Sequence, residues 1–173
     1  MGESGVGKSA VTQEICKRYG LLELQSYTTR KQRFPNETGH IFLSGLTVDE
    51  IKRQFPERVA ETLFDNEFYF ATRQQVDKCD IYVVDPQGIE YLKTKYKGKK
   101  KIKVIYLRCI KFTRIARMQK RGDSPEQISD RITNDSLMFK DASSIADVII
   151  YNDSFERTVA DVWEYITKAE GKK

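Results

Sequence analysis

The sequence predicts a doubly wound α/β fold, in which helices cover both faces of a mainly parallel sheet. Strand-like and helix-like segments alternate along most of the 173 residues, and a glycine-rich loop near the start opens the first helix. With 39% hydrophobic residues, the chain is long enough to bury a substantial core as a single domain.

Apolar periodicity and turn residues divide the chain into elements. Helices are predicted over 8–19, 47–55, 71–79, 87–95, 112–121, 125–139 and 154–169. Strands are predicted within 21–30, 40–43, 57–64, 66–70, 79–85, 103–109 and 146–152. Thr47 is the expected N-cap of the second helix. The strand over 79–85 is expected to be buried and parallel, with Asp85 at its carboxyl end, where open α/β sheets bind ligands.

The composition excludes several classes of protein. No apolar run approaches 18 residues and the mean hydropathy is −0.57, so no membrane association is expected. The three cysteines show no paired spacing and no secretory signal precedes them, which favours the cytoplasm. The basic run KGKKKIK at 97–103 is interpreted as a solvated turn, so the net charge of +5 does not indicate a nucleic-acid partner.

The glycine-rich loop is the strongest single motif. Its sequence GESGVGKS fits the spacing G-x-x-x-x-G-K-[ST], in which backbone N–H groups surround phosphate oxygens, the lysine reaches the outer phosphates and the hydroxyl binds Mg²⁺. We therefore expect a nucleoside triphosphate site here, in preference to a merely structural turn. The expected binding residues are Gly2, Glu3, Ser4, Gly5, Val6, Gly7, Lys8 and Ser9, with Ser9 as the metal ligand.

A second cluster of polar residues follows in SYTTRKQR, at 26–33. Arg30 and Arg33 stand three residues apart in a turn, where two guanidinium groups are able to grip one phosphate bidentately. Taken alone, the pattern is weak and fits two solvated arginines better.

Taken together, the motifs identify a family. GESGVGKS, SYTTRKQR, ETGHIF, AE…FYFAT, VVDPQG, RMQKRGDSPEQISDRI and IIYND occur in this order, and over residues 2–166 the chain resembles a guanylate kinase. The resemblance implies ATP- and Mg²⁺-dependent phosphorylation of GMP, and also of dGMP. It implies one domain over 1–173, with a core (1–29 and 79–173), a β-rich GMP-binding lobe (30–78) and a helical lid (117–131). Whether the protein is a monomer or a dimer stays open.

The resemblance also assigns site residues by matching positions. Arg30 and Arg33 would hold the GMP phosphate together with Tyr69, and Ser26, Glu61 and Asp85 would read the guanine. Carboxylates suit the N1–H and N2–H donors of guanine, and a hydroxyl suits its O6 acceptor. The implied catalytic residues are Lys8 and the lid arginines Arg117, Arg121 and Arg131, and Asn152 matches a position near the adenine of ATP.

The chain departs from the family pattern at several positions. His40 stands where the family usually has a tyrosine, and it is expected to donate to the GMP phosphate in that residue's place. The other departures are Phe70, Ala71, Val83 and Met138. Together they predict a divergent enzyme, slower or less strict in its choice of base.

Only Met1 precedes the loop, although the resemblance places a buried central strand there. Losing about four apolar side chains would cost on the order of 6–12 kcal/mol. We therefore expect either that the natural product begins upstream of Met1, or that this chain is less stable and its phosphate loop poorly ordered.

Two alternatives to a GMP kinase remain. Guanylate-kinase-like domains also serve as non-catalytic protein-binding modules, which commonly lack an intact phosphate loop or the lid arginines. A related nucleotide or sugar-phosphate kinase on the same scaffold would lack the guanine-reading carboxylates.

Overall fold

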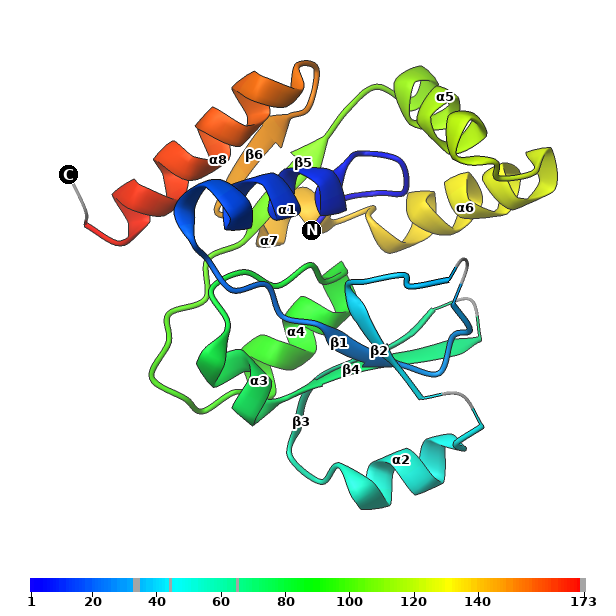
Figure 1. Cartoon of the computed structure of the whole chain (residues 1–173), viewed down its shortest axis with the longest axis vertical. Helices are drawn as coiled ribbons and strands as arrows, with labels where there is room; N and C mark the ends of the chain where they lie inside the picture. The colour runs from blue at the N-terminus through cyan, green and yellow to red at the C-terminus, as the bar shows by residue number, and fades with distance from the viewer. Residues whose placement is uncertain (33–34, 44, 65, 172–173) are drawn as a thin grey trace. The chain divides into compact units, whose positions relative to one another are not determined.

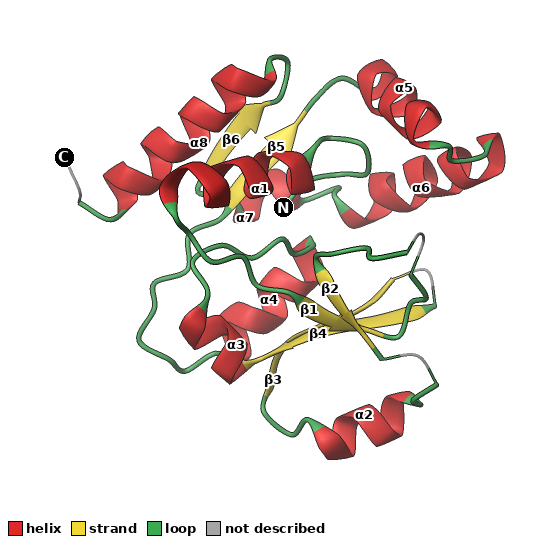
Figure 2. Cartoon of the chain, in the orientation of Figure 1, coloured by secondary structure: helices red, strands yellow, loops and turns green. Residues whose placement is uncertain are grey.

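The computed structural model describes residues 1–32, 35–43, 45–64 and 66–171. The chain forms two compact units. The first, which we call the loop unit, comprises Met1–Gly20 and Lys103–Lys173, and the second, the middle unit, comprises Leu21–Ile102. Figure 1 follows both along the chain, and Figure 2 shows that each combines strands with helices. Among the described residues, no helix is long and apolar enough to cross a membrane.

The loop unit contains two strands and five helices among its described residues. They are α1 (Lys8–Tyr19), β5 (Ile105–Arg108), α5 (Lys111–Arg121), α6 (Pro125–Met138), α7 (Ala142–Ile145), β6 (Val148–Tyr151) and α8 (Phe155–Ala169). β5 and β6 are parallel, with Ile105 opposite Val148. Gly2 forms a further parallel bridge to Leu107 on β5. The first residue of the phosphate loop is therefore held by an isolated bridge to β5.

The helices of this unit begin and end where the sequence predicts. Gly20 and Gly122 end α1 and α5 in the left-handed region, at φ 68° and 94°. Ser124 caps α6 by accepting from the N–H of Gln127, with Pro125 at the first helical position. α1 and α8 are joined by the stacked rings of Tyr19 and Trp163, whose centroids lie 3.6 Å apart. α7, a helix of four residues, was not predicted.

The middle unit is built around a mixed four-stranded sheet. Its elements are β1 (Ser26–Thr28), β2 (His40–Phe42), α2 (Val48–Gln54), β3 (Arg58–Phe64), β4 (Glu67–Thr72), α3 (Arg73–Lys78) and α4 (Pro86–Lys95). The strand order is β2-β1-β4-β3, with β1 parallel to β2 and antiparallel to β4. Thr47 caps α2 in a capping box with Glu50, as the sequence predicts.

The strand predicted over 79–85 is wrong in its extent. Only Ile81 pairs, in an isolated parallel bridge with Glu23, and the segment beyond it is irregular. A buried strand needs a continuous ladder to satisfy its backbone groups. Among the described residues the ladder is limited to the contacts of Asp80 and Ile81 with Leu22 and of Leu24 with Ile81. Asp85 nevertheless follows this segment, as the N-cap of α4.

Phe70 fills the core between the sheet and α2. Phe70 is one of the departures from the expected family pattern; its ring is fully buried and stacks on Tyr27 with centroids 4.9 Å apart. Ile51, Phe68 and Phe55 belong to the same cluster.

Truncating Phe70 is expected to destabilise the protein strongly. Phe70→Ala removes a buried ring and leaves a cavity, which costs about 3–5 kcal/mol in the free energy of unfolding. Urea denaturation measures this loss. Leu63→Ala on β3 is the control, because Leu63 is 60% exposed and its truncation should cost no more than about 0.5 kcal/mol. Equal midpoints for the two variants would contradict the packing described.

Candidate functional site

The phosphate loop connects the Gly2 bridge to the first turn of α1. Gly5 and Gly7 adopt φ values of 75° and 99°, in the left-handed region that L side chains rarely enter. A Cβ on Gly5 would lie 2.6 Å from the backbone oxygen of Arg114, and one on Gly7 would lie 2.5 Å from Nδ2 of Asn152. The two glycines therefore provide both the curvature of the loop and its close approach to neighbouring segments.

The carbonyl groups of the loop are bound by side chains from elsewhere in the loop unit. The Val6 oxygen accepts from Nδ2 of Asn152 at 2.7 Å and from Nη1 of Arg117 at 2.9 Å. The Ser4 oxygen accepts from Nε of Arg114 at 2.9 Å. By contrast, the N–H groups of Gly5, Gly7, Lys8 and Ser9 donate to none of the described residues. N–H groups so arranged at the start of a helix form an anion-binding site.

Lys8 folds back along the loop. Its Nζ donates to the carbonyl oxygens of Gly2 at 2.6 Å and Glu3 at 3.0 Å. Burial lowers the pKa of Lys8 from its ordinary 10.5 to about 8; the positive charges of Arg114 and Arg121 also lower it, whereas nearby carboxylates oppose the change. The ammonium group thus stands in an environment that favours an added anion.

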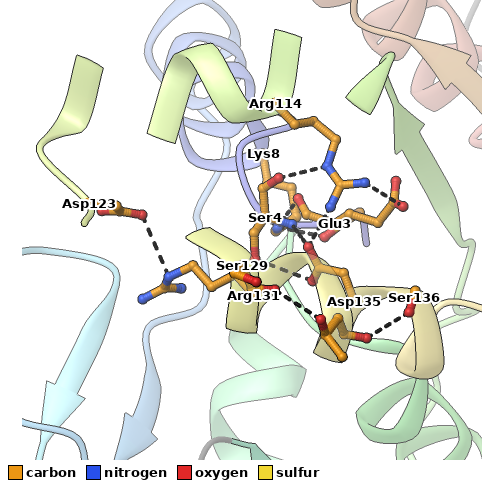
Figure 3. Close-up of polar contacts among 11 residues, drawn as sticks. Glu3, Ser4, Lys8, Arg114, Asp123, Ser129, Arg131, Asp135 and Ser136 are labelled. Atoms are coloured by element: carbon orange, nitrogen blue, oxygen red, sulfur yellow. Dashed lines mark hydrogen bonds and ion pairs between the residues drawn. The ribbon is translucent and has the colours of Figure 1, made fainter. Parts of the chain in front are cut away.

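A buried ion network, which the sequence analysis did not identify, holds the first half of the loop (Figure 3). Arg114 donates through Nη1 to Glu3 at 2.7 Å and through Nη2 to Asp135 at 2.5 Å. Asp135 also accepts from the backbone N–H of Ser4 at 2.8 Å. The only sequence signal was helical spacing, since Arg114 lies three residues before Arg117 and Asp135 four residues after Arg131.

The three predicted lid arginines all lie in the loop unit, but they do not share a partner. Arg117 binds the loop carbonyls and, through Nη2, the backbone oxygen of Asn152 at 3.2 Å. Arg121 donates through Nε to Asp123 at 3.0 Å, and Arg131 forms an ion pair with the same carboxylate at 3.6 Å. Asp123 therefore gathers two of the arginines, while the third supports the loop directly.

Asn152 is buried and has a structural role that the sequence did not indicate. While Nδ2 binds Val6, its Oδ1 accepts from the hydroxyl of Thr158 at 3.1 Å. Its backbone N–H donates to the oxygen of Arg108 at 2.7 Å. Contact of Asn152 with adenine stays a prediction.

In the middle unit, the residues predicted to bind a phosphate lie near one another. Arg30 forms a bidentate pair with Glu37, at 2.8 and 3.1 Å, and its guanidinium lies 5.2 Å from the centroid of the Phe42 ring. The ring centroid of His40 lies 6.1 Å from that of Phe42 and 5.5 Å from that of Tyr69. Arg33, the other predicted phosphate ligand, lies outside the described residues.

His40 contacts a residue predicted to read the base. The hydroxyl of Ser26 and Nδ1 of His40 are 2.9 Å apart, in a hydrogen bond between β1 and β2. Burial and the charge of Asp85 raise the pKa of Tyr82, and the side chain of Ser26 opposes this change. Burial raises the pKa of the Asp85 carboxyl as well, although the N–H of Gly88, at 2.7 Å, stabilises its charge.

Glu61 is held away from these groups by partners of its own. Its Oε1 accepts from the hydroxyl of Tyr91 at 2.6 Å and pairs with Nε of Arg58 at 3.1 Å. The hydroxyl of the neighbouring Thr62 donates to Oε1 of Gln87 at 2.8 Å, and the Thr62 side chain opposes the rise in the pKa of Asp85. Among the described contacts, Thr62 therefore lies beside Asp85, and none of them links Asp85 with Glu61.

The described residues contain no group of three or more His, Cys, Asp or Glu side chains able to hold a metal ion. Ser9 is exposed in the first turn of α1, directly after Lys8. A single hydroxyl fits Mg²⁺, because this ion usually keeps several waters and takes further oxygens from nucleotide phosphates.

Comparisons with known proteins agree with this architecture. The structure is similar to the crystal structure of guanylate kinase from Anaplasma phagocytophilum, with a TM-score of 0.65 and 19% sequence identity over 99% of this chain and 85% of that one. A search of curated proteins by sequence finds no match. The fold is thus the α/β fold of P-loop NTPases. Residues 1–138, which include the phosphate loop and the whole of α6, match a family described as AAA domain, and the chain belongs to that family.

Proposed function

We propose that this protein is a P-loop nucleotide kinase that transfers the γ-phosphoryl group of ATP to GMP, and also to dGMP. The observation that carries the proposal is the loop at residues 2–9, where side chains, Lys8 among them, bind the carbonyl groups while several N–H groups remain for an anion. The fold shared with a guanylate kinase and the motif series from SYTTRKQR to VVDPQG support it.

In this reaction an oxygen of the acceptor phosphate attacks the γ-phosphorus of ATP. The new P–O bond forms while the bond to the β,γ-bridging oxygen breaks, giving GDP and ADP. Positive charge around the transferred group carries most of the rate. We assign this charge to Lys8 and to the lid arginines Arg117, Arg121 and Arg131, the last two of which would exchange Asp123 for phosphate oxygens.

Mg²⁺ bound with ATP would supply further positive charge at the phosphates. Ser9 is the residue that would hold it, through its exposed hydroxyl. The loop residues Gly2–Ser9 would contact the triphosphate, and Asn152 the region of the adenine.

The acceptor site is assigned to the middle unit. Arg30, Arg33, His40 and Tyr69 would bind the phosphate of GMP, with Arg30 leaving Glu37 for the more highly charged group. Ser26, Glu61 and Asp85 would bind the guanine. A buried carboxylate left without the donors of the correct base loses about 1–3 kcal/mol or more, which is the source of base selection.

A related kinase with another base preference is the second candidate. It is favoured by the position of Glu61, which is bound by Arg58 and Tyr91, whereas Thr62 and Gln87 lie beside Asp85. A hydroxyl and an amide both donate and accept, so they select less strictly than a carboxylate pair.

An ADP-release assay with ATP and Mg²⁺ tests the proposal across GMP, dGMP, AMP, UMP and CMP. Turnover confined to GMP and dGMP is the expected result. Turnover of another monophosphate would favour the second candidate. GMP binding without turnover would favour a protein-binding module, and the absence of both would refute a GMP kinase.

Asp85→Asn is expected to lower kcat/KM for GMP by about 10²-fold, because the amide no longer accepts two donors from guanine. Asparagine remains a good N-cap, so α4 and the melting temperature should be preserved. Glu90→Gln, an exposed change on the same helix, is the control. If Asp85→Asn changes kcat/KM for no monophosphate by more than Glu90→Gln does, Asp85 does not read the base.

A further inference from the structure

The network that holds the start of the phosphate loop is more deeply buried than the lid arginines. Arg114 on α5 is 5% exposed and Asp135 on α6 is 3% exposed. Between them they bind Glu3 through its carboxylate and Ser4 through its N–H, hydroxyl and carbonyl groups. Figure 3 shows these side chains converging on the loop from the two helices.

The fork of the guanidinium matches this arrangement. Three nitrogens of Arg114 donate to three different acceptors, namely two carboxylates and a carbonyl. A lysine at this position offers no such fixed geometry. Because the acceptors come from the loop and from α6, Arg114 holds three segments of the chain in one arrangement.

The second half of the loop depends on the same helix. Arg117, three residues after Arg114 on α5, donates to the carbonyl oxygens of Val6 at 2.9 Å and Gly5 at 3.4 Å. One face of α5 therefore contacts loop residues 3–6 through Arg114 and Arg117. A displacement of this helix would move the contacts of both arginines. Buried polar networks of this kind have few alternative arrangements, since each unpaired group is costly.

We propose that Arg114 and Asp135 are positioning residues that couple the helices α5 and α6 to the shape of the phosphate loop, and so set its affinity for the triphosphate of ATP. The proposal rests on the proposed function. Neither residue touches the nucleotide. They act through Glu3 and Ser4, whose placement directs the N–H groups that follow toward the phosphates.

The test compares Arg114→Lys and Asp135→Asn with Lys120→Met, an exposed change on the same helix. We expect both network variants to raise the KM and the dissociation constant for ATP at least about tenfold, because each removes charge-assisted hydrogen bonds to the loop. The KM for GMP should change less than about twofold, and Asp135→Glu should recover part of the affinity for ATP. The double variant should lose little more than either single variant, since both changes break one network.

A role confined to stability gives a different result. It would lower the melting temperature and the amount of folded protein but leave the KM for ATP unchanged in the folded fraction. ATP affinities equal to that of Lys120→Met in both network variants would overturn the proposal.

Failure of the GMP kinase assignment is distinguishable from failure of this coupling. If ATP binds but GMP is not phosphorylated, the dissociation constant for ATP still tests the network. If ATP does not bind, amide hydrogen exchange over residues 2–9 decides. Faster exchange in Arg114→Lys and Asp135→Asn than in Lys120→Met supports the coupling, and equal exchange overturns it.

Discussion

Lys8→Met is expected to reduce ADP release with GMP by about 10³-fold. Methionine has nearly the same length and keeps the apolar stem, but it carries no charge to balance the transferred phosphoryl group. In the structure Nζ is held between the carbonyl oxygens of Gly2 and Glu3, within the loop that we assign to the triphosphate. The assay is run at saturating ATP, so that the loss reflects transfer rather than binding. Activity within tenfold of the original protein would exclude Lys8 from the reaction.

The pH dependence of the original protein checks the same role. Because the pKa of Lys8 is lowered to about 8, kcat/KM for ATP should fall as the pH rises through about 8, where the free protein loses the ammonium charge. Lys8→Arg should lack this decrease, since arginine stays protonated. Between about pH 8 and 10.5 the unfolded state binds more protons at this group, so its contribution to stability rises with pH. A loss of activity between about pH 8 and 10.5 therefore cannot be attributed to unfolding driven by the titration of Lys8.

Local rules explain why most elements were predictable. Thr47 caps α2 through its own hydroxyl, and Gly20 ends α1 at a positive φ that favours glycine. Both features depend on residues within one turn of the helix, which the sequence displays directly. The phosphate loop was predictable for the same reason, because its spacing is local.

The contacts of the site depend on distant segments and were much less predictable. Arg114 contacts Glu3 across 111 positions, and no local pattern distinguishes it from the other arginines of α5. The prediction of a strand over 79–85 was wrong in its extent for a similar reason, because the length of a strand depends on the distant segment that pairs with it. The predicted guanine ligand Glu61 also illustrates this point: the motif marks a carboxylate, but Tyr91 and Arg58 determine where that carboxylate lies.

Gly5→Ala is expected to disrupt the phosphate loop. An alanine at φ 75° costs about 1–2 kcal/mol from backbone strain alone. Its Cβ would also lie 2.6 Å from the backbone oxygen of Arg114, a contact that no side-chain rotation relieves, and this adds about 1–3 kcal/mol. Calorimetry should show a dissociation constant for ATP raised at least about tenfold, because the N–H groups of the loop are displaced.

Gly20→Ala separates backbone strain from the steric clash. Gly20 has a similar φ of 68°, but an added Cβ would meet nothing within 4 Å. Its replacement should therefore cost only about 1–2 kcal/mol and leave ATP affinity unchanged. If Gly5→Ala and Gly20→Ala lose equal stability and retain equal affinity, α5 does not constrain the loop. If Gly5→Ala loses more stability and more ATP affinity than Gly20→Ala, the helix carrying Arg114 determines how closely the loop backbone packs. Glycine is then required at position 5 because it has no side chain as well as for its φ.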